Sequence, residues 1–480
     1  MLLRNFAFNL VGLGAPLLVA ALTIPALLSE LGTQRFGFLA LMWALVSYFG
    51  LFDLGLGRAV THQLASLYAG PQPDSRIGQV LGTAVILMAA IGASTGLLIA
   101  GLAEPLVRHI SELPSFREAV HAVYWMAFAM PAIVVNSALR GALEARHSFA
   151  IVNAIRVPMG LFTYLGPLLV LWWIGPRLDW MAAVLAFGRV VACGAHAAFV
   201  LRGAQAPRLE WTSSMVMPML RAGGWMSVSN VVGPLMGNAD RFIIAGLLSA
   251  TAVTYYAVPH ELVTRFWLVP GALTAVLFPT FAVQASQGFT DDGRLFMRAV
   301  QGMFLALLPP TAALALFAPE LLTAWLGAEM ASTCTPLLRI FAFGVLLNGV
   351  ATVPYTLLQG AGHARTTALI HCFELPVFMG LMWWLTLSHG VFGAALAWLL
   401  RMLFDSAAMF LVVRRATPRS AGRWRSRDGA LVVGAIAAFS VSLLPELAPR
   451  AVAAVMLAGC AAWMAINTWR LRRPAPEISG

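Results

Sequence analysis

The chain has 480 residues, of which 60% are hydrophobic and only 11% are charged. Soluble domains carry roughly 25% charged residues, so this composition excludes an ordinary soluble protein and indicates a membrane protein with many spans. The formal net charge of +11 does not indicate a nucleic-acid-binding protein, because that role needs a concentrated, solvated basic face and the basic residues here are spread along the chain.

Windows of about 20 apolar residues predict an all-α polytopic membrane protein with fourteen spans. In chain order the predicted spans occupy residues 5–28, 37–60, 77–103, 118–140, 149–174, 179–202, 213–247, 252–283, 294–318, 333–360, 365–388, 391–413, 428–445 and 449–470. No stretch between them is long enough for a soluble domain. The apolar run at the N-terminus leads directly into the next span, so we interpret it as an uncleaved first helix.

The arginines are distributed by membrane side. If the N-terminus is cytoplasmic, the cytoplasmic ends and loops hold 19 arginines, from Arg4 through the run Arg414–Arg427 to the tail. The opposite side holds only five, which are Arg35, Arg108, Arg117, Arg177 and Arg450. The positive-inside rule therefore predicts that both termini lie in the cytoplasm. The expected location is the bacterial inner membrane.

Two segments repeat each other around an arginine near the middle of a long apolar span, Ala183–Arg189 and Ala395–Arg401. A second pair, Leu139–Arg146 and Leu358–Arg365, joins the fourth and fifth spans of each six-span unit. Because six is an even number, both units have the same orientation and form parallel repeats. We predict two six-helix lobes around a central cavity, with chance similarity of Ala/Leu/Gly-rich helices as the alternative. The predicted parts are 1–205, 206–413 and 414–480, the last holding an Arg-rich linker, two more helices and a cytoplasmic tail.

Three stretches carry a resemblance to a known family: Leu31–Phe38, Leu51–Gly57 and Asn238–Ala257. They resemble the "LG-x-x-x-[FY]-G" turn between helices one and two, the "D-x-G-x-G" stretch in helix two, and the start of the second lobe. The family is the Wzx-type oligosaccharide-lipid flippases of the multidrug/oligosaccharidyl-lipid/polysaccharide exporter superfamily. Their order, the repeat and the fourteen spans agree with it over nearly the whole chain.

The resemblance implies a flippase that moves polyprenyl-diphosphate-linked oligosaccharide across the membrane by alternating access. Such cargo feeds the biosynthesis of O-antigen, capsule or exopolysaccharide. The implied partners are the lipid-linked glycan, membrane lipids, and a polymerase and glycosyltransferases of the same pathway, with no nucleic acid. No cofactor is expected, and either a proton or a sodium gradient is a candidate driving force.

Arginines inside spans are candidates for a cationic cavity, because a charge at the bilayer centre is costly and normally faces a polar interior. Guanidinium groups replace phosphate hydration through bidentate, charge-assisted hydrogen bonds. For each candidate, an ion pair or snorkelling to the interface is the alternative; Asp405 is an available partner for Arg401 and Glu261 for Arg265. The candidate substrate-binding residues are Arg189, Arg401, Arg265, Arg58 and Arg156.

Acidic residues inside spans are candidates for coupling, because a buried acid near neutral pKa binds and releases a proton. The alternative for each is an ion pair that neutralises an arginine. The candidates, with the two histidines beside them, are Asp53, Glu261, Glu374, Asp405, His260 and His371. Asp240 and Arg241 are expected to have a structural or gating role, and His196 to be a packing histidine. The four cysteines show no metal-ligand or disulfide spacing, and no catalytic residue is predicted.

Three other functions stay open. A lipid II flippase also has fourteen spans, but its usual charged pair after a "YxA"-like stretch is replaced here by Val258 and Pro259. A drug or cation antiporter of the same superfamily usually has twelve spans. A membrane polymerase or ligase would carry a large outer loop with catalytic residues, and the longest outer loop expected here, 104–117, has no recognisable catalytic arrangement.

The arginine asymmetry gives a test of topology. In a variant whose four native cysteines are replaced, single cysteines at Arg76, Arg208 and Arg419 should react with a membrane-impermeant maleimide only after the cells are opened. Cysteines at Thr33 and Glu329 should react in intact cells. Labelling of any of the first three positions in intact cells would contradict the predicted orientation.

Overall fold

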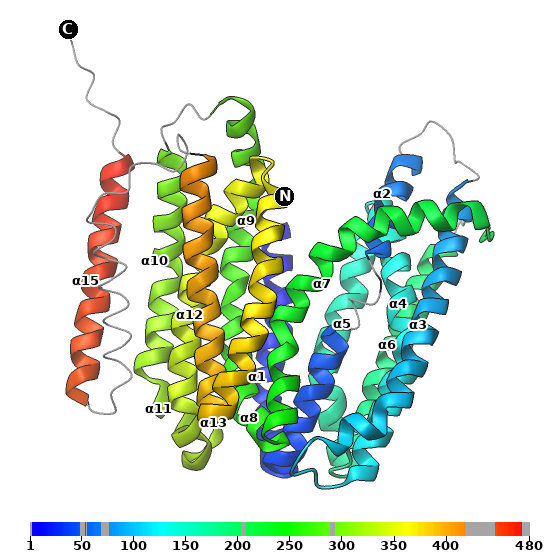
Figure 1. Cartoon of the computed structure of the whole chain (residues 1–480), viewed down its shortest axis with the longest axis horizontal. Helices are drawn as coiled ribbons and strands as arrows, with labels where there is room; N and C mark the ends of the chain where they lie inside the picture. Colours follow the sequence, from blue (N-terminus) through cyan, green and yellow to red (C-terminus); the bar gives the residue numbers. More distant parts are fainter. Residues whose placement is uncertain are drawn as a thin grey trace. The chain divides into compact units, whose positions relative to one another are not determined.

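The computed structural model describes residues 2–48, 53, 55–68, 76–202, 208–288, 293–417 and 447–472. These residues form fourteen α-helices and two short 3₁₀ helices, without a β-strand among them (Figure 1). Eight helices in this part of the chain are long and apolar enough to cross a membrane. The predicted all-α membrane class is therefore confirmed, while the predicted span 428–445 and most of the Arg-rich linker lie outside the described residues.

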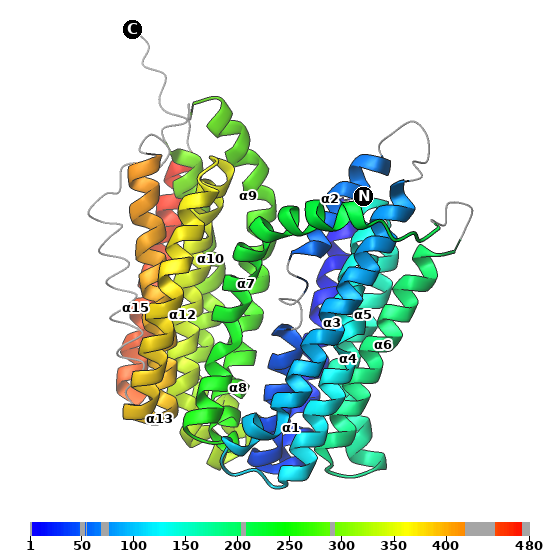
Figure 2. The same ribbon diagram turned by 45° about the vertical axis from the view of Figure 1, so that its right-hand side comes forward.

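The chain forms two compact units, residues 1–254 and 255–480. In the first unit α4 packs between α3 and α6, and α5 packs on α6 and α1 (Figure 2). The helices are α1 (Leu2–Tyr48), α2 (Leu56–Tyr68), α3 (Arg76–Arg108), α4 (Phe116–Ala145), α5 (Phe149–Trp173), α6 (Leu178–Val200) and α7 (Val216–Leu247), followed by α8 (Ala250–Thr264), which crosses the boundary.

In the second unit α12 is central and contacts α9, α10, α11 and α13. The helices are α9 (Leu268–Ser286), α10 (Arg294–Leu316), α11 (Ala318–Leu326), α12 (Ala328–Gly360), α13 (Ala364–Ala416) and α15 (Leu447–Arg472). The last helix, α15, lies against α10, and its Arg450 forms a 2.7 Å ion pair with Glu320 of α11.

The boundary between the units differs from the predicted lobe boundary at 205/206. Helix α7 contacts α1, α2 and α3 and so belongs to the first unit. The division into two lobes around a central cavity, with boundaries at 205/206 and 413/414, stays a prediction.

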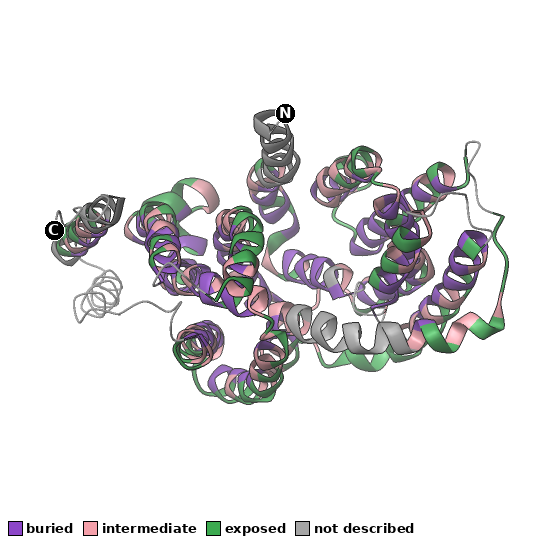
Figure 3. Ribbon diagram, turned by 90° about the horizontal axis from the view of Figure 1, so that it is seen from above, coloured by how far each residue is buried: buried purple, intermediate pink, exposed green. Residues whose placement is uncertain are grey.

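Lipid-facing and core-facing sides can be distinguished on the helices. In Figure 3 buried residues lie where helices face one another and exposed residues lie on the outward faces. Large apolar side chains are among the exposed ones: Leu97 is 76% exposed, Phe187 65% and Trp173 82%. Apolar surface of this kind is stable only against lipid, so the pattern agrees with the composition.

Two glycines reverse the chain between consecutive predicted spans. Gly32 has φ 69° inside α1, and Gly390 has φ 59° inside α13; both values favour glycine, which has no Cβ to clash in this region. Helix α13 has 53 residues and would be about 80 Å long if straight, far more than the roughly 30 Å of bilayer hydrocarbon. It is therefore a hairpin of two arms, Ala364–His389 and Val391–Ala416, which match predicted spans 365–388 and 391–413.

The predicted second span, 37–60, is not one continuous helix. The second part of α1 ends at Tyr48, and α2 begins at Leu56. Between them the Asp53 carboxylate accepts a 2.8 Å hydrogen bond from the backbone N–H of Gly55, an Asx-type turn that prepares the start of α2. The predicted eighth span, 252–283, likewise consists of α8, a 3₁₀ turn at Arg265–Trp267, and α9.

Close packing at the α13 hairpin gives a test of its geometry. A Cβ added to Gly393 would collide with the backbone carbonyl of Leu385 in the other arm, whereas one added to Gly380 meets nothing within 4 Å. Gly393→Ala should therefore destabilise the protein by about 1–3 kcal/mol. Gly380→Ala should leave the thermal unfolding midpoint in detergent unchanged or raise it, because alanine favours helix. Equal midpoints for the two variants would contradict the hairpin.

Candidate functional site

A pocket lies inside the first unit among α4, α5 and α6. Each helix contributes one face, since the lining residues recur at helical spacing. From α4 come positions i, i+3 and i+7 (Ile133, Asn136, Arg140), and α6 repeats that spacing with Arg189, Ala192 and His196. From α5 come Val152, Ile155, Arg156, Met159, Gly160 and Thr163. The pocket volume is about 270 Å³.

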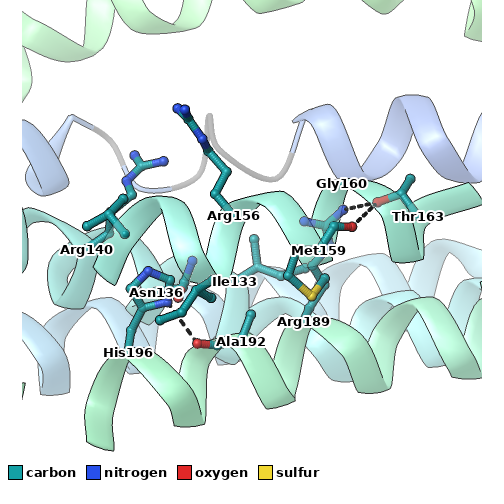
Figure 4. A pocket seen from close by; sticks show the side chains of 12 residues that line it. Ile133, Asn136, Arg140, Arg156, Met159, Gly160, Thr163, Arg189, Ala192 and His196 are labelled. Carbon is teal, nitrogen blue, oxygen red and sulfur yellow. Dashed lines mark hydrogen bonds between the residues drawn. The ribbon is translucent and has the colours of Figure 1, made fainter. Parts of the chain in front are cut away.

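The lining of this pocket is cationic. It contains Arg140, Arg156 and Arg189, and none of the described residues that line it carries a carboxylate. Figure 4 shows Arg140 and Arg156 extending to the same side, with Arg189 beside Met159 and Thr163. Among the described residues, Arg140 forms an ion pair with Glu144, which lies one helical turn further along α4. Oε1 of Glu144 is 3.6 Å from Nε of Arg140. The pocket therefore carries an excess of positive charge.

Three buried polar atoms in the pocket wall have no hydrogen-bond partner among the described residues. They are Nε of Arg189, Oδ1 of Asn136 and Nε2 of His196. Arg189 makes one long contact, 3.4 Å from Nη2 to the Thr163 hydroxyl, and His196 uses Nδ1 on the Ala192 carbonyl at 2.8 Å. An unsatisfied buried polar group costs about 1–3 kcal/mol, so three around one pocket indicate a place for a polar ligand.

The pocket runs along the helices from one end of the unit toward its middle. The end of α4 and the end of α6 meet there, since Arg146 donates to the Val200 carbonyl at 3.4 Å. Arg189 lies eleven residues before Val200, the last residue of α6. At 1.5 Å per residue, it is about 16 Å from this end of the helix, measured along the helix axis. A fixed charge at that depth in hydrocarbon is stable only if it faces a polar interior.

The predicted substrate-binding arginines divide between this pocket and other places. Arg189 and Arg156 line the pocket, and Arg58 lies exposed in the first turn of α2, outside the pocket lining. The other two are in the second unit and form ion pairs. Nε of Arg401 lies 3.0 Å from Oε1 of Glu374, and Nη2 of Arg265 lies 2.6 Å from Oε2 of Glu261. The ion-pair alternative thus describes the contacts of these two arginines.

The candidate coupling residues also divide. His371, Glu374 and Asp405 come together in the second unit, where one side-chain nitrogen or oxygen atom of each lies within 4.8 Å of those of the other two. His260 is instead buried against aromatic rings, with the centroids of Tyr256, Phe341 and Trp398 between 5.1 and 5.5 Å away. Asp53 caps the turn described above.

The predicted gating pair, Asp240 and Arg241, is buried on α7. The carboxylate of Asp240 accepts a 2.8 Å hydrogen bond from the backbone N–H of Arg241. This contact agrees with a structural role, and a gating role stays a prediction.

Beside Arg189 and Arg156, the pocket lining holds polar residues that sequence reasoning does not assign to a site: Asn136, Arg140, Thr163 and His196. The positive-inside pattern accounts for Arg140 as one of the 19 cytoplasmic arginines, and His196 is expected to be a packing histidine. The signal for those on α4 and α6 is the i, i+3, i+7 spacing that Ile133, Asn136 and Arg140 share with Arg189, Ala192 and His196. Their assignment needs the register between the helices, which the spacing alone does not give.

Arg401 and Arg189 are both partly buried, and their different contacts predict opposite effects on stability. Arg401→Met should lower the free energy of unfolding by about 3–5 kcal/mol, because Glu374 is left as a buried unpaired charge. Arg189→Met should leave it unchanged or raise it, because the variant removes a buried guanidinium that has no acidic partner in the pocket. Thermal unfolding in detergent measures both. A large loss of stability in the Arg189 variant would contradict the assignment of that residue to a ligand site.

Comparisons with known proteins give the family. Residues 31–334 match the family described as "Polysaccharide biosynthesis protein". The chain is 26% identical over 406 residues to the "Putative O-antigen transporter" of Shigella flexneri, covering 84% of this chain and 96% of that protein. The fold is similar to that of the lipid II flippase MurJ in an inward closed conformation, with a TM-score of 0.72 at 11% identity over 97% and 99% of the two chains.

The fold is also similar to that of an inward-facing multidrug resistance MATE family transporter of the MOP superfamily, with a TM-score of 0.70 at 14% identity over 85% and 97% of the two chains. The resemblance found in the sequence is confirmed by these relatives, which are a putative O-antigen transporter, a lipid II flippase and a multidrug resistance transporter. Because the family match covers more than half of its residues, the chain belongs to the polysaccharide biosynthesis protein family.

Proposed function

We propose that the protein is a flippase that moves polyprenyl-diphosphate-linked oligosaccharide units from the cytoplasmic to the outer leaflet of the inner membrane. By alternating access it would supply O-antigen, capsule or exopolysaccharide biosynthesis. The observation that carries this proposal is the pocket among α4, α5 and α6, with three guanidinium groups, no carboxylate and three unsatisfied buried polar atoms. The family and the Shigella flexneri relative support the cargo class.

The chemistry of the pocket suits the headgroup of such a cargo. A lipid-linked sugar diphosphate carries about two negative charges, and moving them through hydrocarbon unassisted is prohibitive. The N–H groups of Arg189, Arg156 and Arg140 replace phosphate hydration with charge-assisted hydrogen bonds. The Oδ1 atom of Asn136 accepts a hydrogen bond, which a phosphate oxygen does not donate and a sugar hydroxyl does. The site thus offers groups for both parts of a sugar diphosphate.

The size of the pocket limits what enters it. A volume of about 270 Å³ is slightly below the range of about 300–1,000 Å³ that is typical of ligand pockets. It suits a diphosphate and the first sugar, with the rest of the glycan and the polyprenyl tail outside.

The charge of the pocket also bears on two alternative functions, a drug or cation antiporter and a lipid II flippase. A cationic lining repels the cationic drugs that an antiporter would carry, because like charges brought together without compensation cost free energy. Lipid II shares the polyprenyl diphosphate, so its phosphate chemistry fits the pocket equally well. The glycan is what separates the two flippase functions.

Transport by the purified protein in vesicles tests the proposal. The probe is a fluorescent polyprenyl-diphosphate-linked oligosaccharide, and flipping is followed by loss of fluorescence to a membrane-impermeant quencher. Arg189→Ala should lower the initial rate about ten- to a hundred-fold, since a charge-assisted hydrogen bond contributes about 1.5–3 kcal/mol. Arg189→Lys should recover part of the rate, because charge remains and bidentate geometry does not.

The matched control is Arg108→Ala. Arg108 is also an arginine of the first unit, but it is exposed at the end of α3 and paired with Glu104 at 3.4 Å. This variant should flip the probe at the wild-type rate. Wild-type flipping by Arg189→Ala would refute the site, and faster flipping of lipid II than of the oligosaccharide probe would replace the proposed cargo with a peptidoglycan precursor.

A further inference from the structure

A second pocket lies at one end of the first unit, among α2, α3 and the start of α7. Its volume is about 290 Å³. Each side of it is one face of a helix: Gln63 and Leu67 of α2 are four residues apart, as are Arg76 and Val80 of α3. Figure 1 shows the start of α7 lying across the helices beside α2, so the third side of the pocket is formed by an element that crosses the end of the unit.

The connector between α6 and α7 holds this third side in place. Residues 208–212 run beside α3, where Gly82 leaves room for them, because a Cβ at this position would collide with the backbone of Glu210. The backbone N–H of Thr212 donates to the Thr83 hydroxyl of α3 at 3.0 Å. The short 3₁₀ helix η2 (Ser213–Met215) follows at once and contacts α3, and it leads into α7. The connector therefore fixes the start of α7 as a wall of the pocket.

The lining of this pocket has a polar part and an apolar part. Arg76, Gln63 and Ser214 offer a guanidinium, an amide and a hydroxyl as hydrogen-bond donors. The apolar part includes Val80 and Met219, which are 5% and 1% exposed. None of the described residues that line the pocket carries a carboxylate. A ligand that uses both parts has an anionic headgroup joined to an apolar body.

The charges at the pocket limit the charge of that headgroup. Arg76 is the single charged residue among the described lining residues. One turn further along α3, Nε2 of Gln79 lies 3.5 Å from Oε2 of Glu210, whose carboxylate adds negative charge to this end of the unit. A phosphodiester with one negative charge suits this arrangement. A diphosphate, with about two negative charges, is better matched by the three guanidinium groups of the pocket among α4, α5 and α6.

The position of the pocket indicates where the ligand comes from. Arg76 begins α3, and it belongs to the 19 arginines that the positive-inside pattern assigns to the cytoplasmic side. The cytoplasmic leaflet is the one that attracts basic residues through its anionic lipids, and basic pockets between membrane helices on that side bind phospholipid headgroups. A lipid of that leaflet brings its phosphate to the depth of Arg76 while its acyl chains stay in the bilayer.

We propose that the pocket among α2, α3 and the start of α7 binds an anionic phospholipid of the cytoplasmic leaflet. The phosphodiester contacts Arg76, and the glycerol backbone and first acyl carbons pack on Val80 and Met219. The bound lipid joins α2 and α3 to the start of α7, and it stabilises the protein by mass action because the pocket exists only in the folded chain. The inference is independent of the proposed function, since the cargo is assigned to a different pocket.

Native mass spectrometry of the purified full-length protein, titrated with phosphatidylglycerol in detergent, tests the site. Phosphatidylcholine with the same acyl chains is the comparison lipid. Phosphatidylglycerol should fill one site about five-fold or more tightly than phosphatidylcholine, because its headgroup keeps the negative charge that a nearby arginine attracts. It should also raise the thermal unfolding midpoint of the wild type.

The charge of the pocket is tested by Arg76→Gln. This variant should bind phosphatidylglycerol about ten-fold or more weakly, because a charge-assisted hydrogen bond is lost, and the lipid should no longer raise its unfolding midpoint. The matched control is Arg294→Gln. Arg294 is also exposed at the first position of a helix, α10, on the same predicted membrane side but in the second unit. The control variant should bind the lipid as the wild type does.

A second pair of variants separates the pocket from general surface charge. Ser214→Trp places an indole ring in the pocket and keeps Arg76, so it should also weaken binding of phosphatidylglycerol. Ser213→Trp changes the preceding residue, which is equally exposed but lies outside the lining, and should leave binding unchanged.

Four results would overturn the proposal. Two are equal affinity for the two lipids and wild-type affinity in both Arg76→Gln and Ser214→Trp. The third is displacement of phosphatidylglycerol by glycerol 1-phosphate at equal concentration, which would replace the lipid with a soluble phosphate ester. The fourth is displacement by a polyprenyl diphosphate at a lower concentration than that of phosphatidylglycerol, which would assign this pocket to the cargo.

Discussion

The energetic penalty for charge in hydrocarbon organises this protein. A buried ion must find a counter-ion, a polar cavity or a ligand, since removing one from water costs several kcal/mol even after relaxation. In the second unit, Arg265 pairs with the carboxylate of Glu261 at 2.6 Å, and Arg401 pairs with that of Glu374 at 3.0 Å. In the first unit Arg189 lines a pocket whose described lining residues include no carboxylate. Arg265 and Arg401 are thus neutralised within the fold, whereas the proposed function gives the charge of Arg189 to a ligand.

Most of the helices could be predicted from sequence because lipid imposes a simple rule on them. Each span must be about 20 apolar residues long and must satisfy its own backbone, so hydropathy locates the segments that form the eight long, apolar helices of the described residues. Hydropathy does not predict where local hydrogen bonds or turns interrupt a helix inside an apolar segment. The Asx turn at Asp53 interrupts the second span, and apolar composition does not distinguish a broken helix from a continuous one.

The candidate site was predicted less completely, for a geometric reason. Depth within a span identifies a costly arginine, which is how Arg189 and Arg156 were found. A partner on another helix is separated in sequence by the turn between the helices, and Glu374 lies 27 residues before Arg401. Local i, i+4 spacing therefore identified the Glu261–Arg265 pair and offered Asp405 to Arg401, while the contact with Glu374 required the fold of the hairpin.

Under the proposed function, the membrane potential favours export of the cargo. With the inside of the cell negative, each negative charge that moves outward gains about 2.3 kcal/mol per 100 mV, so outward movement of a diphosphate headgroup would be downhill. Charge-assisted hydrogen bonds contribute about 1.5–3 kcal/mol each, so the demanding step of the proposed cycle would be release of the headgroup from the guanidinium groups of the pocket.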